Sequence, residues 1–151
     1  MNGQVFIDAS AWFAVSNPRD SRYGEAQDAL AALQAEHAEF LTTSLVIAEI
    51  HALLTGRLHP AAALSVLDGT AADPAFTIVH VDPALQAAAV DRWLRVYRDR
   101  SFSLCDAVSF EVMRRERITR AFTLDHHFAV AGFTMVPGPP AAKGRQPRTR
   151  R

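Results

Sequence analysis

Short apolar runs that favour β-strands alternate with segments of helical spacing, and this alternation constrains the fold most. The candidate strands lie at residues 5–7, 40–42, 76–81, 120–124 and 133–136. The helical patterns between them lie at 9–15, 23–36, 44–56, 60–67, 83–97 and 104–115, with a helical turn at 125–131. The alternation predicts an α/β fold with a central, mainly parallel sheet of about five strands and helices on both faces.

The chain has the size of one domain. Its 151 residues are 49% hydrophobic, which is enough for one real core and leaves no room for a second domain. We expect the folded domain to span residues 1–136. From Pro137 onward Pro, Gly and Arg dominate, so residues 137–151 are predicted to form a disordered basic tail.

Charge is balanced overall but not along the chain. Both the basic and the acidic residues number 16, yet five of the basic ones stand in residues 137–151, where no acid occurs. The remaining body, with 11 basic and 16 acidic residues, is acidic. This argues against broad, nonspecific nucleic-acid binding and favours a pocket for cations. The tail is a candidate for modest electrostatic contact with RNA.

The sequence predicts a soluble, cytoplasmic protein. A single cysteine, Cys105, excludes an intramolecular disulfide framework and fits a reducing compartment. The apolar stretch before Asp8 is too short for a signal sequence, and no run approaches the length of a membrane span. On its predicted helix Cys105 should point away from Asp106, as a small buried residue rather than a reactive thiol.

Four carboxylates lie where apolar runs meet helices or turns. Asp8 and Asp125 directly follow strand-like runs, and parallel strands bring their carboxyl ends to one edge of a sheet. Glu49 borders the apolar stripe of its helix, and Asp106 shares a face with Phe110 and Met113. The four acids are therefore predicted to converge on one pocket.

A pocket of four acids predicts bound metal. Buried carboxylates without partners cost several kcal/mol or more and repel one another, and hard divalent ions relieve both penalties. Oxygen ligands suit Mg²⁺ or Mn²⁺, which would support phosphodiester hydrolysis by a metal-activated water. Taken singly, Asp8 and Asp106 could instead be helix-terminal charges, Glu49 a solvated helix residue and Asp125 a turn former.

Four motifs in order resemble those of PIN-domain ribonucleases, most closely the VapC toxin type. They are IDAS at 7–10, SLVIAE at 44–49, SLCDA at 103–107 and TLDHHF at 123–128. The resemblance covers about residues 4–136. Cys105 stands where threonine is more usual, and the basic tail has no counterpart in the pattern.

The resemblance implies a site and partners. It makes Asp8, Glu49, Asp106 and Asp125 the catalytic, metal-binding acids, with Ser10 as a polar helper. It further implies Mg²⁺- or Mn²⁺-dependent endonucleolytic cleavage of RNA, a homodimer, and inhibition by a cognate VapB-type antitoxin in a toxin–antitoxin hetero-oligomer.

Several alternatives stay open. An RNA-processing nuclease without an antitoxin, or a non-catalytic RNA- or protein-binding module on the same fold, would also fit these motifs. Ser10 is an alternative candidate for a plain helix cap. For His126 and His127, adjacent positions in a turn indicate one exposed and one packed residue, and for Arg98 and Arg100 a solvated face competes with contacts to RNA phosphates.

Overall fold

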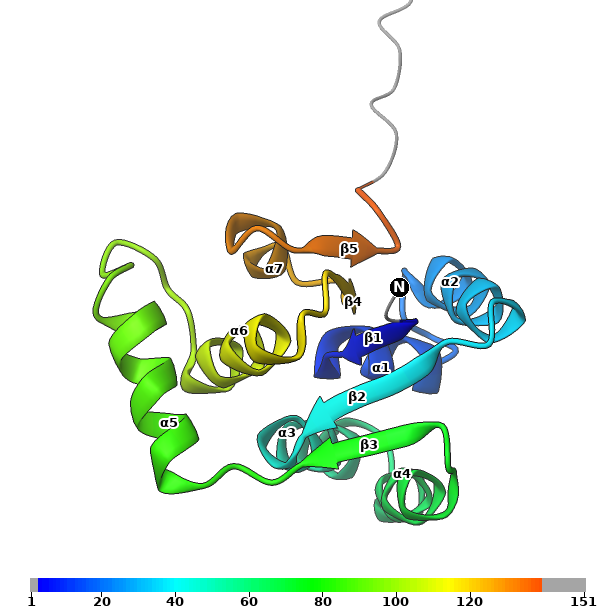
Figure 1. Ribbon diagram of the computed structural model, residues 1–151. Helices are drawn as coiled ribbons and strands as arrows, with labels where there is room; N and C mark the ends of the chain where they lie inside the picture. The colour runs from blue at the N-terminus through cyan, green and yellow to red at the C-terminus, as the bar shows by residue number, and fades with distance from the viewer. Residues whose placement is uncertain (1–2, 140–151) are drawn as a thin grey trace, which may run out of the picture.

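The computed structural model describes residues 3–139 and contains one five-stranded sheet (Figure 1). The strands are β1 (Gln4–Ile7), β2 (Glu39–Thr43), β3 (Phe76–Val79), β4 (Arg120–Phe122) and β5 (Thr134–Val136). Their order is β3-β2-β1-β4-β5, and all four pairings are parallel. The predicted α/β fold is thus confirmed, with a sheet that is wholly parallel among the described residues.

The helices contact one another in two groups. The first comprises α1 (Ala9–Ser16), α2 (Tyr23–Ala35), α3 (Ser44–Arg57) and α4 (Pro60–Ala72). The second comprises α5 (Pro83–Ala89), the π-helical turn η1 (Val90–Leu94), α6 (Leu104–Glu116) and α7 (His127–Val130). Connections between parallel strands are right-handed. The helices of connections that add strands toward β3 therefore cover one face of the sheet, and the helices of connections that add strands toward β5 cover the other face.

Local sequence explains where the helices begin. The Thr43 hydroxyl accepts a hydrogen bond from the Val46 amide to cap α3, and Asp82 caps α5 in the same way, ahead of Pro83. Ser103 and Asp106 cap α6 reciprocally, each side chain accepting from the other's backbone amide. The core beneath is rich in phenylalanine, with Phe110 packed edge-on against Phe128.

Several predicted boundaries shift. α3 continues through Gly56 to Arg57, and α4 runs past Leu67 to Ala72, because tertiary packing extends both helices. The run at 76–81, predicted to be a buried strand, is the half-buried edge strand β3. No helix within residues 3–139 is long and apolar enough to cross a membrane. Most of the predicted tail, residues 140–151, lies outside the described part of the chain.

Candidate metal centre

The sheet has one topological switch point, between β1 and β4. The chain builds the sheet outward from β1 to β2 and β3, and then returns across β1 to add β4 and β5. Crossovers leave in opposite directions at such a point, so a crevice opens at the carboxyl ends of the two strands. Asp8 follows β1 here, and Thr123 to Asp125 follow β4. The Asp8 amide donates to the Phe122 carbonyl oxygen at 3.0 Å, which joins the two strand ends.

Asp8 is buried and held by two hydroxyl groups. Ser10 Oγ donates to Asp8 Oδ2 at 2.6 Å, and Thr123 Oγ1 donates to the same oxygen at 2.9 Å. Burial raises the pKa of Asp8 from 3.8 to about 6, the two hydroxyl groups oppose that rise, and the charges of Glu49 and Asp125 add to it. The carboxylate is therefore costly in its ionised form unless a cation joins it.

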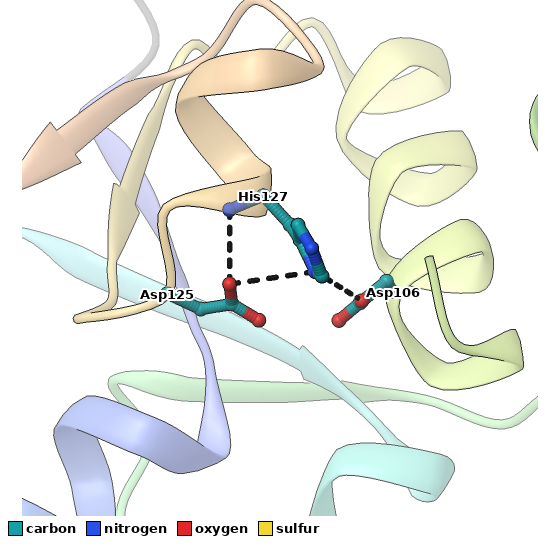
Figure 2. Close-up of side chains that lie close together, drawn as sticks. All are labelled: Asp106, Asp125 and His127. Carbon is teal, nitrogen blue, oxygen red and sulfur yellow. Dashed lines mark hydrogen bonds and ion pairs between the residues drawn. The ribbon is translucent and has the colours of Figure 1, made fainter. Parts of the chain in front are cut away.

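Asp106, Asp125 and His127 lie together (Figure 2). His127 Nδ1 is 3.2 Å from Asp106 Oδ2 and 3.5 Å from Asp125 Oδ1, and the His127 amide donates to Asp125 Oδ1 at 2.9 Å. One ligand atom from each of the three residues falls within a 4.8 Å cluster. Burial raises the pKa of Asp106, and the nearby Asp125 charge raises it further against the hydrogen bonds from Ser103 and His127.

Glu49 borders the same crevice from α3. Its side chain is exposed, but its charge raises the pKa of Asp8, and it interacts directly with the Cys105 thiol. Of the four predicted acids, Asp106 and Asp125 share the 4.8 Å group with His127, while Asp8 and Glu49 lie outside that group. The charges of Glu49 and Asp125 nevertheless reach Asp8 and raise its pKa. Asp8 and Asp106 are buried, Asp125 is half-buried, and Glu49 is exposed.

The donor set fits a hard divalent cation. Among the described residues, every hydrogen bond to Asp8 or Asp106 goes to Oδ2, and those to Asp125 go to Oδ1. One oxygen of each carboxylate is therefore fixed by the protein while the other can coordinate an ion. Carboxylate oxygens with an imidazole nearby suit Mg²⁺ or Mn²⁺.

Two neighbours of the acids, His127 and Thr123, were not predicted from the sequence to take part in the site. His127 is packed against the ring of Phe102 and hydrogen-bonds at the acid cluster, whereas His126 is exposed, as expected for adjacent turn residues. Thr123 links Asp8 to the Asp125 amide, which donates to its hydroxyl at 2.9 Å. Thr123 is a fully buried polar residue at the end of a strand, and its burial is the feature that marks it as part of the site. The sequence alone does not show this burial.

The expectation that Cys105 is a buried residue was wrong, whereas the expected unreactive thiol agrees with the structure. The residue is only partly buried and lies beside Glu49 rather than away from the site. Burial, followed by the Glu49 charge, raises the pKa of its thiol, which keeps the sulfur protonated and unreactive. The start of α6 thus presents both Cys105 and Asp106 to the crevice.

Replacing Thr123 by valine tests the hydroxyl link. The change keeps the shape of the side chain but leaves the half-buried Asp125 amide without its acceptor and Asp8 without one donor. We expect the free energy of unfolding to fall by about 1–3 kcal/mol and RNA cleavage to fall about 10- to 100-fold. Thermal unfolding and a cleavage assay measure the two effects. Thr77→Val, at an exposed position of β3, is the matched control and should change neither the stability nor the cleavage rate. Equal effects of the two variants would contradict a special role for the Thr123 hydroxyl.

A parallel α/β sheet with carboxylates gathered at its switch point is the architecture of a PIN domain, and the PIN family model matches residues 5–134. The chain therefore belongs to the PIN-domain family. The 23S rRNA-specific endonuclease VapC20 of Mycobacterium tuberculosis, known from strains CDC 1551 and H37Rv, is 34% identical over 135 residues, which cover 87% of this chain and 97% of the relative. The crystal structure of M. tuberculosis VapC20, described as a sarcin-ricin loop cleaving toxin, superposes with a TM-score of 0.76 at 31% identity, covering 86% of this chain and 96% of that one.

Proposed function

We propose that this chain is an endoribonuclease, the toxin of a type II toxin–antitoxin pair, which hydrolyses RNA phosphodiester bonds. The observation that carries the proposal is the set of carboxylates at the switch point, where the hydrogen bonds from described residues to Asp8, Asp106 and Asp125 all go to one oxygen of each group. The chain spans nearly the full length of a relative named as a 23S rRNA-specific endonuclease. An RNA-processing nuclease without an antitoxin is less well supported, since that relative belongs to the VapC toxins.

We assign the metal-binding role to Asp8, Glu49, Asp106 and Asp125. PIN-domain nucleases generally depend on divalent metal ions, and we propose Mg²⁺ or Mn²⁺ for this site. A bound ion would activate a water molecule and stabilise the charge that develops on the phosphate. Ser10 and Thr123 hold Asp8 in one orientation, while Ser103 and His127 do the same for Asp106.

The proposed partners follow from the toxin class. They are an RNA substrate, a VapB-type antitoxin and a second copy of the chain in a homodimer. Size-exclusion chromatography with light scattering, on the toxin alone and with the product of any small gene directly upstream, tests both protein partners. A monomer that does not bind the upstream gene product would contradict both the homodimer and the antitoxin complex.

Metal-dependent cleavage is the direct test of the nuclease. Purified protein is incubated with 23S rRNA, with an isolated sarcin-ricin stem-loop and with unrelated structured RNA, each in Mg²⁺, Mn²⁺ or EDTA. We expect internal cuts in Mg²⁺ or Mn²⁺ and none in EDTA. Cutting that persists in EDTA would contradict the metal centre, while tight RNA binding without cleavage in either metal would support a binding module instead.

A further inference from the structure

A second charged cluster lies on the far side of α6 from the acids. Glu111, whose side chain is only 1% exposed, accepts from Arg114 Nη2 at 2.9 Å and from Arg115 Nε at 2.9 Å. Arg92 Nε, from η1, lies 3.2 Å from its other oxygen. We call Arg92, Arg114 and Arg115 the arginine collar.

The arginine collar carries more positive charge than Glu111 neutralises. Burial alone would raise the pKa of Glu111, but the hydrogen bonds from Arg114 and Arg115 outweigh it and lower the pKa to about 2. One carboxylate thus faces three guanidinium groups, which leaves two charges in excess. The three arginine side chains are each 45–52% exposed, so N–H groups that Glu111 does not use face solvent in a fixed arrangement.

A hollow of about 540 Å³ adjoins the collar. Arg92 and Arg114 line it together with Trp93, Val96 and Tyr97. The Asp91 carboxylate also lines it, but Arg95 Nε binds that group at 2.9 Å. The volume falls in the range of sites for small ligands, and guanidinium groups beside the one exposed aromatic ring of the lining, Tyr97, suit a nucleotide.

A row of rings joins the collar to the metal centre. Trp93 stacks on Tyr97 with centroids 5.7 Å apart, Tyr97 contacts Phe102 at 5.8 Å, and Phe102 contacts His127 at 5.4 Å. His127 is the residue that hydrogen-bonds at the acid cluster. Three ring-to-ring steps therefore separate the two sites, a span that a few nucleotides of a stacked strand cover at about 3.4 Å each.

We propose that the arginine collar binds a backbone phosphate of the RNA substrate, a few nucleotides from the cleaved bond, with Tyr97 placed to contact a base. The inference rests on the proposed function and adds a second anchoring point to it. Arginine forks match phosphate oxygens in a bidentate manner. The short distance between the collar and the acids favours RNA over an acidic protein segment, since one RNA strand could contact both sites.

The test is RNA binding by a catalytically silent Asp8→Asn protein, with and without R92Q and R114Q. Glutamine keeps amide donors for Glu111 while removing two charges, and Arg115 stays in place. We expect the collar variant to bind the sarcin-ricin stem-loop about 5- to 30-fold more weakly and to lower the salt slope by about 1–2. The control is the pair R22Q and R120Q, away from the crevice. Each of these arginines also forms two hydrogen bonds to a glutamate, Arg22 to Glu25 and Arg120 to Glu36.

Three outcomes would overturn the collar proposal. The first is that the Asp8→Asn parent shows no measurable binding to RNA. The second is that the collar and control variants lose equal RNA affinity. The third is that the collar variant binds RNA as tightly as the parent but loses affinity for an acidic peptide. Thermal unfolding of each variant shows whether the fold is kept. Cleavage by the otherwise unaltered protein tests the nuclease separately, so failure of the collar and failure of the proposed function are distinguishable.

Discussion

Asp8→Asn should abolish RNA cleavage and at the same time make the metal-free protein more stable. Asparagine keeps the shape and can accept from Ser10 and Thr123, but it removes an anionic ligand from the centre of the crevice. Without this ligand the transition state loses several kcal/mol of charge stabilisation, and each loss of about 1.36 kcal/mol lowers a rate tenfold. We therefore expect the cleavage rate to fall about 10³-fold or more. A cleavage assay in Mn²⁺ measures this loss.

The gain in stability has a separate cause. The pKa of Asp8 is raised from 3.8 to about 6, so holding it ionised at pH 7.5 costs the fold about 3 kcal/mol. The neutral amide avoids most of that cost, and we expect the free energy of unfolding in EDTA to rise by about 1–3 kcal/mol. Asp28→Asn, on the exposed face of α2, should change neither quantity. A destabilised Asp8→Asn protein, or one that still cuts RNA, would refute the assignment of Asp8.

Binding of Mn²⁺ or Mg²⁺ should weaken steeply below about pH 6. An ion needs Asp8 deprotonated, so below the raised pKa each unit of pH costs about a factor of ten in apparent affinity. In the metal-free protein the sign is opposite. Between the ordinary pKa of 3.8 and about 6 the native state binds more protons than the unfolded state, so stability falls as the pH rises.

Thermal unfolding with and without Mn²⁺ at pH 5, 6 and 7.5 separates the two trends. We expect the stabilisation by metal to be small at pH 5 and large at pH 7.5. In the Asp8→Asn protein the dependence on pH should be shallower, because the titrating group is gone. If Mn²⁺ stabilises the unaltered protein equally at pH 5 and at pH 7.5, then protons and the ion do not compete for Asp8.

Much of the fold was predictable because local signals agreed with the tertiary structure. Asp8, Thr43 and Ser103 each cap the helix that follows them, and the apolar runs that lead to Asp8 and Thr43 pair as strands. The edge strand β3 was misjudged because an apolar run looks the same whether one face or both are covered. The π-helical turn at Val90 to Leu94 has no signal in the helical spacing.

The acids were predictable, but their supporting groups were not. Strand ends and helix faces place Asp8, Glu49, Asp106 and Asp125 at one edge from sequence alone. The hydrogen bonds of Thr123 and His127 depend on side chains that meet only after β4 pairs with β1, at separations of 115 and 21 residues. The position of Cys105 beside Glu49 was not predictable, because the angle between neighbours on one helix does not show which side chains of other helices lie near them.

The order in which the sheet is built bears on when the enzyme can act during its own synthesis. Asp8 leaves the ribosome 115 residues before Thr123, and β4, the neighbouring strand that completes the surroundings of Asp8, directly precedes Thr123. Domains fold as units, and pairings between distant segments form late. A nascent or truncated chain that stops before Thr123 therefore has the first acid without its hydroxyl donor, without Asp125 and without the strand that anchors the turn. Potential harm to the cell's RNA is thus delayed until almost the whole domain has been translated.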